Sequence, residues 1–146
     1  MLNRKWLLII LLAASSVGIV AAGFSTAAHW NTGLYGFCEL GEYFNCNVVN
    51  TSKYAEIMGV PVALFGLLSY TAFFIYGLIS LKKPSLILST FAGSLAIVGL
   101  GFSLYLSSVE AFILHTWCVV CITSQVAIIL VAACVFWIRS IDSKNM

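Results

Sequence analysis

Four of the five cysteines fall into two pairs whose spacing suits thiol chemistry. Cys118 and Cys121 form a Cys-x-x-Cys motif at the expected start of a helix, where free backbone N–H groups and the helix dipole favour a thiolate. Cys38 and Cys46 enclose seven residues, which is enough to close a disulfide in a loop. Two such pairs side by side can pass two electrons by thiol–disulfide exchange through a mixed disulfide.

Two other interpretations of these cysteines stay open. Both pairs could be stabilising disulfides of a four-span scaffold or interaction protein, although a two-residue gap constrains little chain entropy. The four sulfurs could instead form a structural zinc site with His115 as a further candidate ligand, because zinc sites use the same spacing. The loop pair is spaced more widely than is usual for zinc, so we expect no metal. The fifth cysteine, Cys134, is interpreted as a small buried apolar residue.

The apolar composition indicates which elements must position these cysteines. Of 146 residues, 62% are hydrophobic and 8% are charged, against roughly 45–50% and about 25% in soluble domains. Four uncharged stretches are each long enough to cross a bilayer as a helix, at residues 6–28, 58–81, 84–108 and 112–138. We therefore predict an all-α membrane protein, a four-transmembrane-helix bundle that forms a single domain over residues 1–146. The first stretch exceeds the apolar core of a signal peptide, so we interpret it as a retained span.

The positions of the basic residues predict an orientation. Positive residues in short loops stay in the cytoplasm, and six of the seven basic residues lie near the chain ends or at Lys82 and Lys83. Both termini are therefore predicted to be cytoplasmic, and the loop 29–57 and the start of the last helix extracytoplasmic, where disulfides persist. We expect a bacterial or archaeal plasma membrane. A net charge of +2 provides no basic stripe for nucleic acid.

A relay of this kind needs an electron acceptor. The chain has no Gly-x-Gly-x-x-Gly nucleotide motif, and a lipid-soluble quinone is an oxidant that is present in the bilayer itself. Quinone reduction is therefore the simplest end of the circuit. The triplet Asn50-Thr51-Ser52 matches a glycosylation acceptor, but we interpret it as ordinary loop polarity.

The order of these features resembles the vitamin K epoxide reductase family, and in particular its prokaryotic branch. The resemblance covers nearly the whole chain and is specific through the order of its parts rather than through any one of them. Those parts are the four spans, Cys38 and Cys46, the stretches 52–55 and 59–66, Tyr70, and the segment 118–123.

This resemblance implies a role for each cysteine. Cys38 would exchange with a reduced thioredoxin-fold partner and Cys46 would attack Cys118. Cys121 would then deliver the electrons to a quinone of the ubiquinone, menaquinone or vitamin K type, so that the protein supports extracytoplasmic disulfide formation. The loop between the first two helices would cap the bundle as a lid. Its aromatic side chains would either dip into the membrane surface or pack within the loop: Tyr35, Phe37, Tyr43 and Phe44.

The resemblance also implies quinone contacts at Phe65, Gly66, Gln125 and Phe37. Animal members carry a tyrosine at the position of Gln125 and an asparagine near the position of Val62, so epoxide reduction is not expected here. Gln125 can still donate or accept a hydrogen bond.

The sequence also bears on the redox partner and on a second family with similar features. Many prokaryotic relatives carry a fused thioredoxin-like domain, whereas this chain ends seven residues after Arg139, so we expect the partner to be a separate protein. The quinone-linked disulfide-bond oxidase also has four helices and two cysteine pairs, but its Cys-x-x-Cys motif lies in the first outer loop. The motif at Cys118 and Cys121 therefore favours the reductase-like family.

Overall fold

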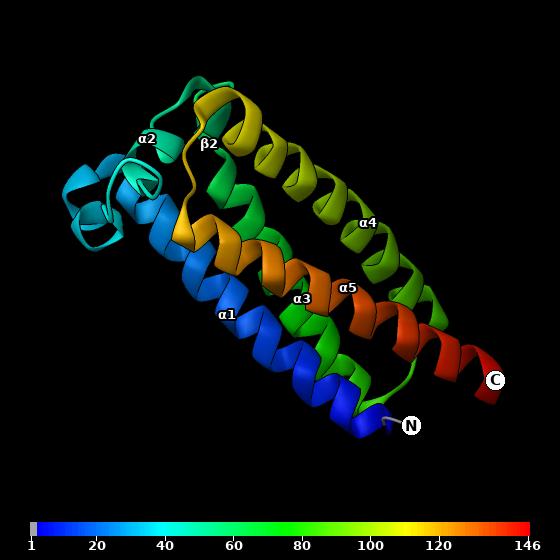
Figure 1. Ribbon diagram of the computed structural model, residues 1–146. Coiled ribbons are helices and arrows are strands. Elements are labelled where there is room, and N and C mark those ends of the chain that lie inside the picture. The colour runs from blue at the N-terminus through cyan, green and yellow to red at the C-terminus, as the bar shows by residue number, and fades with distance from the viewer. Residues whose placement is uncertain (1–2) are drawn as a thin grey trace.

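The computed structural model describes residues 3–146 and contains four helices long and apolar enough to cross a membrane. They are α1 (Arg4–Trp30), α3 (Val62–Lys82), α4 (Leu86–Val109) and α5 (Val119–Asn145). Both ends of the chain lie at one end of the bundle, and the segments that connect α1 to α3 lie at the other (Figure 1). The predicted all-α membrane bundle is confirmed, and the protein is an integral membrane protein.

The first three expected spans correspond to α1, α3 and α4, with one shift at the start of α3. Residues 58–61 belong to a small hairpin of β1 (Glu56–Ile57) and β2 (Val60–Pro61) rather than to a helix. Met58 and Gly59 form its turn with φ angles of 55° and 81°, a region that glycine adopts without steric cost. The helix therefore begins at Val62, directly after Pro61.

The start of the fourth expected span, at residue 112, is wrong. The helix of α4 continues as the π-helical segment η3 (Glu110–Leu114), a short turn follows, and α5 begins at Val119. The uncharged stretches end on either side of Glu110, because a carboxylate is costly in lipid and its charge predicts a break between two spans. The structure buries this carboxylate inside the protein, where it accepts a hydrogen bond from the backbone N–H of Cys118 at 3.2 Å.

Apolar packing holds the four helices together. Helix α1 packs chiefly against α3 and α5, and α4 packs against α5. The shared core includes Leu11, Phe73, Val131 and Ile138, and Cys134 is buried within it as expected. Gly18 leaves room for the ring of Tyr70 from α3 to lie against α1, because a Cβ atom at this position would clash with that ring.

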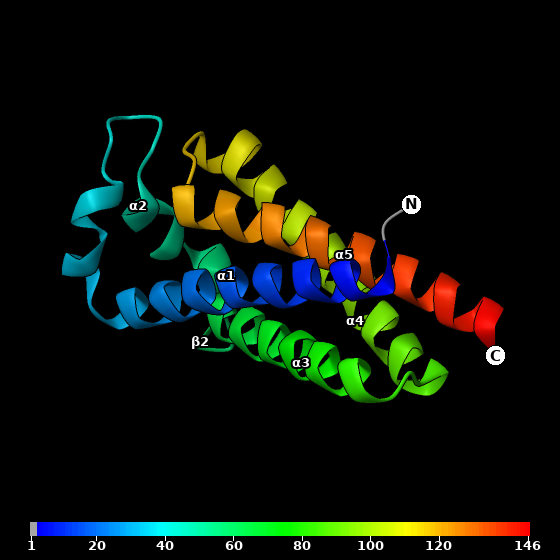
Figure 2. The same ribbon diagram turned by 90° about the horizontal axis from the view of Figure 1, so that it is seen from below.

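The loop expected at residues 29–57 is folded. It contains η1 (Thr32–Cys38), α2 (Cys46–Asn50) and η2 (Lys53–Ala55), and α2 lies beside the start of α5 (Figure 2). A second, smaller core fills this end of the molecule: Ala28, Tyr35, Cys38, Cys46, Val49 and Cys118. Tyr35 is fully buried there, so of its two expected roles packing within the loop is correct and a place at the membrane surface is wrong. Phe37, Tyr43 and Phe44 are exposed.

Candidate active site

Cys38 and Cys46, called the loop pair below, are positioned by two short helices. Cys38 ends η1 and Cys46 begins α2, and a disulfide joins them with a Cα–Cα distance of 5.6 Å. The Asn45 side chain caps α2 by accepting the backbone N–H of Val48 at 3.1 Å. Both sulfurs lie in the small core, with exposed fractions of 1% for Cys38 and 0% for Cys46. The pair is therefore formed and shielded.

Cys118 and Cys121, called the helix pair below, have the local structure that the sequence predicts. Cys118 is the N-cap of α5, and its Sγ accepts the backbone N–H of Cys121 at 3.4 Å. Both cysteines are free thiols. The hydrogen bond from the Cys121 thiol, followed by the backbone N–H groups of Cys121 and Val120, holds the pKa of Cys118 below its ordinary value, although burial opposes this. Cys118 is therefore the more readily ionised of the two thiols.

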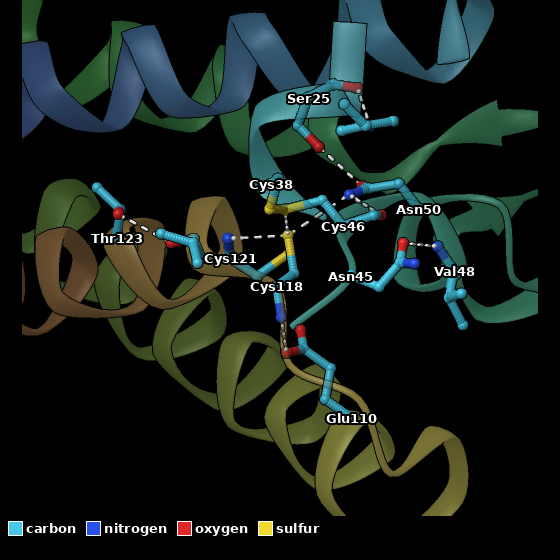
Figure 3. Close-up of a disulfide and its surroundings, with 12 residues drawn as sticks. Ser25, Cys38, Asn45, Cys46, Val48, Asn50, Glu110, Cys118, Cys121 and Thr123 are labelled. Atoms are coloured by element: carbon cyan, nitrogen blue, oxygen red, sulfur yellow. Dashed lines mark hydrogen bonds between the residues drawn. A yellow bond between two sulfur atoms is a disulfide. The ribbon is translucent and has the colours of Figure 1, made fainter. Parts of the chain in front are cut away.

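The two pairs meet at a single junction. The Sγ atoms of Cys46 and Cys118 lie 3.0 Å apart (Figure 3). A thiolate attacks a disulfide sulfur directly, so this contact places Cys46 and Cys118 where exchange between the two pairs can run in either direction. The structure thus brings the four cysteines singled out in the sequence to one end of the bundle and pairs Cys46 with Cys118 across the junction.

The same cluster bears on the zinc alternative. The sulfurs of Cys38, Cys46 and Cys118 lie within 4.8 Å of one another, so three thiolates here could ligate a metal. Zinc binds thiolates, and with the loop pair joined as a disulfide only Cys118 of the three retains a thiol. His115, the proposed further ligand, is exposed on the turn before α5.

Asn50 is a site residue that the sequence reasoning missed. Its Nδ2 donates to the sulfur of Cys118 at 3.6 Å and to the carbonyl of Cys46 at 3.1 Å, while its Oδ1 accepts from the Ser25 hydroxyl at 2.8 Å. The interpretation of Asn50 as ordinary loop polarity is wrong, because the side chain is buried. The available signal was its spacing: Asn50 follows Cys46 by four residues, which places both on one face of a helix.

Glu110 is the second residue that was missed. It is 4% exposed, its Oε2 accepts the Cys118 N–H at 3.2 Å, and the Cys121 thiol lies close enough to hydrogen-bond with the carboxyl. Its charge led us to place it in a loop. An intramembrane carboxylate is a functional candidate by default, and that argument could have identified it.

A cavity of about 370 Å³ lies between the four helices directly behind the helix pair. Cys121 and three of the four expected quinone contacts, Phe65, Gly66 and Gln125, lie on its wall. Phe37 does not: its ring packs against Phe24 with centroids 5.2 Å apart and is otherwise exposed. Most of the wall is apolar, and Cys121 connects the cavity to the cysteine cluster.

Polar groups on the cavity wall are held in fixed orientations. The Gln125 Oε1 accepts from the Ser103 hydroxyl and from the Ser107 hydroxyl, the latter at 3.0 Å. The amide nitrogen is therefore the group that Gln125 can direct at a ligand. The Tyr70 hydroxyl donates to the Ser124 carbonyl at 2.6 Å, which ties α3 to the first turns of α5.

Tyr35 packs in the small core that contains Cys38 and Cys46. Its hydroxyl donates to the carbonyl of Ser25 at 3.2 Å, and burial raises its pKa to about 12. The phenol is therefore neutral at physiological pH. It serves as a hydrogen-bonded part of the small core that carries the loop disulfide.

Comparison with known protein families agrees with this geometry. The model described as the vitamin K epoxide reductase family matches residues 9–136. The matched region contains both cysteine pairs, the loop between α1 and α3 and most of the four long helices. The resemblance found in the sequence is confirmed, and it supports an oxidoreductase that acts through thiol–disulfide chemistry. The chain belongs to the vitamin K epoxide reductase family.

Proposed function

We propose that this protein is a quinone-dependent thiol:disulfide oxidoreductase. It passes electrons from a reduced thioredoxin-fold protein through Cys38 and Cys46 to Cys118 and Cys121, and then to a membrane quinone. The observation that carries the proposal is the 3.0 Å contact between the sulfurs of Cys46 and Cys118, with Cys121 on the wall of an apolar cavity.

The first step requires the loop to open. A partner thiolate attacks Cys38 and releases Cys46, and the partner's second thiolate then displaces Cys38, so that the partner leaves oxidised and the loop pair reduced. In the structure Cys38 is only 1% exposed. Two backbone hydrogen bonds tie the segment between Cys38 and Cys46 to the residue before the helix pair: Trp117 N–H donates to Tyr43 O at 2.8 Å, and Asn45 N–H donates to Trp117 O at 3.1 Å. These bonds are few and lie at the surface, so the segment can open at a modest cost in free energy.

The second step transfers the electrons between the pairs. Reduced Cys46 attacks Cys118, Cys121 is expelled from its disulfide, and Cys38 then displaces Cys118 to restore the loop disulfide. The Asn50 amide and the Cys121 N–H stabilise negative charge on the Cys118 sulfur. A joined loop pair beside free Cys118 and Cys121 corresponds to the state reached after this transfer.

The cavity fits a quinone ring. Its volume of about 370 Å³ lies in the range of small-molecule sites, and its wall is apolar with a few polar groups. Phe65, Gly66 and Gln125 would hold the ring, which accepts two electrons and two protons when bound. Ubiquinone, menaquinone and vitamin K type quinones are all candidates. Val62 lines the cavity and its side chain has no hydrogen-bond donor, so epoxide reduction is not part of the proposal.

The distribution of charge supports an orientation. Arg4, Lys5, Lys82, Lys83 and Arg139 lie near the end of the bundle that carries the chain termini. By the positive-inside rule this end faces the cytoplasm. The cysteine end then faces the outside of a bacterial or archaeal plasma membrane, where an oxidising compartment suits a function in disulfide formation.

Anaerobic quinone reduction tests the proposal. Purified protein in detergent is given a reduced thioredoxin-fold donor and ubiquinone or menaquinone analogues, and Cys121→Ser is compared with wild type. We expect turnover in wild type, none above background in Cys121→Ser, and normal turnover in the matched control Cys134→Ser, whose thiol lies apart in the bundle core. No turnover with any quinone would contradict the proposal. Bound zinc that is lost on chelation would favour the metal site, and two inert disulfides would favour the scaffold.

A further inference from the structure

Glu110 is a buried carboxyl that the relay described above leaves without a role. It is 4% exposed and lines the cavity together with Cys121. Its Oε2 accepts the backbone N–H of Cys118 at 3.2 Å, and the Cys121 thiol lies beside it. The two ion pairs found within residues 3–146 involve other carboxylates. Within that range Glu110 therefore has no cationic partner to fix its charge.

The backbone aims Glu110 at the cysteines. It opens the π-helical segment η3, and its carbonyl accepts the N–H groups of His115 and of Thr116, the latter at 3.2 Å. His115 adopts a left-handed conformation with a φ of 51°, which turns the chain back toward the start of α5. Single π-helical turns of this kind occur frequently at functional sites. Figure 3 shows Glu110 directed at Cys118 from the end of α4.

The chemistry of the pair requires a proton at this place. When Cys46 attacks Cys118, the Cys121 sulfur leaves as a thiolate in a largely apolar cavity. An unpaired anion there is costly. A neutral carboxylic acid in contact with the departing sulfur removes this cost by giving it a proton.

We propose, on the basis of the function proposed above, that Glu110 is the acid–base group that exchanges a proton with the Cys121 sulfur. In the exchange step the bond from Cys46 to Cys118 forms and the bond from Cys118 to Cys121 breaks. The electron pair of the broken bond stays on the Cys121 sulfur, which takes the proton from Glu110.

The reverse transfer completes the cycle. When Cys118 and Cys121 are oxidised again, their disulfide forms and two electrons and two protons leave the pair. The electrons go to the quinone acceptor. The Cys121 proton returns to the Glu110 carboxylate before it leaves the site, and the two quinone oxygens take up two protons in all.

Other titratable groups on the cavity wall are less well placed for this role. They are His29, Tyr54 and Tyr70. His29 is hydrogen-bonded to a backbone carbonyl and to an exposed carboxylate, and the hydroxyl of Tyr70 donates to a carbonyl of α5. Glu110 is the carboxyl that contacts both members of the helix pair.

A quinone-free measurement tests the inference. Fully oxidised protein is mixed with a reduced small dithiol, and the loss of the Cys118–Cys121 disulfide is followed by rapid quenching and mass spectrometry across pH. We expect wild type to give a bell-shaped profile, rising as the attacking thiol ionises and falling as Glu110 loses its proton. Glu110→Gln keeps the shape and an acceptor for the Cys118 N–H. In this variant the helix-pair disulfide should be lost about 100-fold more slowly or slower still, and the pH profile should rise without falling again.

Glu110→Asp and Glu42→Gln are the companion variants. Glu110→Asp retains an acid and should keep a falling limb at a reduced rate, whereas Glu42→Gln changes an exposed loop carboxylate and should match wild type. A wild-type rate and profile in Glu110→Gln would overturn the inference, as would a slow rate with an unchanged profile. If Glu110→Gln fails to fold, a falling limb in Glu110→Asp at the wild-type pH and rate overturns it. Failure of wild type to pass electrons to the helix pair would instead refute the proposed function.

Discussion

Glu110 and Asp142 are equally buried carboxylates at opposite ends of the same bundle, each 4% exposed, and their surroundings differ. Asp142 accepts from Arg4 at 2.8 Å, and Arg4 also donates to the Ser80 carbonyl at 2.9 Å. Glu110 meets the backbone N–H of Cys118 and the thiol of Cys121 instead. The terminal end neutralises its charge and fixes the helices, whereas the cysteine end keeps a titratable group beside a cavity. Burial alone therefore does not distinguish a structural carboxylate from one that takes part in the reaction. The groups that contact the carboxylate do.

The largest effect should come from breaking the junction at the cysteine end. Cys46→Ser removes the sulfur that links the two pairs, so turnover with a protein donor should fall to background. The helix pair itself stays intact, and after chemical reduction it should still reduce quinone in a single turnover. Donor-driven turnover that persists in Cys46→Ser would show that electrons bypass the loop pair.

Asn50→Leu should slow the exchange between the pairs without removing any sulfur. The lost hydrogen bond to the Cys118 sulfur contributes about 1.5–3 kcal/mol when the acceptor is charged, which is roughly 10- to 150-fold in rate. Stopped-flow reduction of the helix pair measures this. Thr51→Val is the matched control, because the exposed Thr51 hydroxyl donates to the Asn47 carbonyl of α2, which it follows directly.

The pH dependence of the same reaction gives a second readout. The thiol hydrogen bond from Cys121 and the backbone N–H groups hold the pKa of Cys118 below its ordinary value, so the thiolate is present at a lower pH than for a free cysteine. In the reduced protein the rate of Cys118 alkylation should therefore rise at a lower pH than the rate for a free cysteine. In Asn50→Leu the midpoint should move to higher pH, and an unmoved midpoint would contradict the role given to Asn50.

Asp142→Asn should destabilise the terminal end and leave the chemistry unchanged. It leaves Arg4 without its carboxylate, at a cost of about 1–3 kcal/mol because Arg4 is 23% exposed and partly solvated. Unfolding in a denaturing detergent should show the loss, while the exchange rate between the cysteine pairs stays at the wild-type value. A large fall in that rate would mean that the two ends are coupled.

The smallest effect is expected at Tyr35, which packs beneath the loop disulfide. Tyr35→Phe loses one neutral hydrogen bond, worth about 1 kcal/mol. Burial raises the pKa of Tyr35 from 10.0 to about 12, so the unfolded chain loses the phenol proton first. The protonated phenol therefore contributes fully to the free energy of unfolding below pH 10, and this contribution is lost as the pH approaches 12. The advantage of wild type over Tyr35→Phe should shrink over this window, and a constant difference would contradict the assignment.

The sequence predicts the bundle well because hydropathy reports directly on exposure to lipid. It also predicts the two cysteine pairs, since residue spacing alone defines them. The charge of Glu110 suggests a place in water, whereas the Cys118 N–H group and the Cys121 thiol accommodate its carboxyl inside the protein. Asn50 and Cys118 are 68 residues apart, and no local pattern reports such a contact. Phe37 was assigned to the cavity by resemblance, but its ring packs outside on Phe24.

The most direct test of the relay is the identity of the bond that forms between the two pairs. In Cys121→Ser, the Cys118 thiolate should attack Cys46 and release Cys38, and alkylation of Cys38 then prevents this thiol from re-forming the loop disulfide. Rapid alkylation of the freed thiol followed by peptide mapping under non-reducing conditions identifies the bond. We predict a disulfide between residues 46 and 118 with Cys38 alkylated. A bond between residues 38 and 118, or no bond between the pairs in folded protein, would contradict the relay.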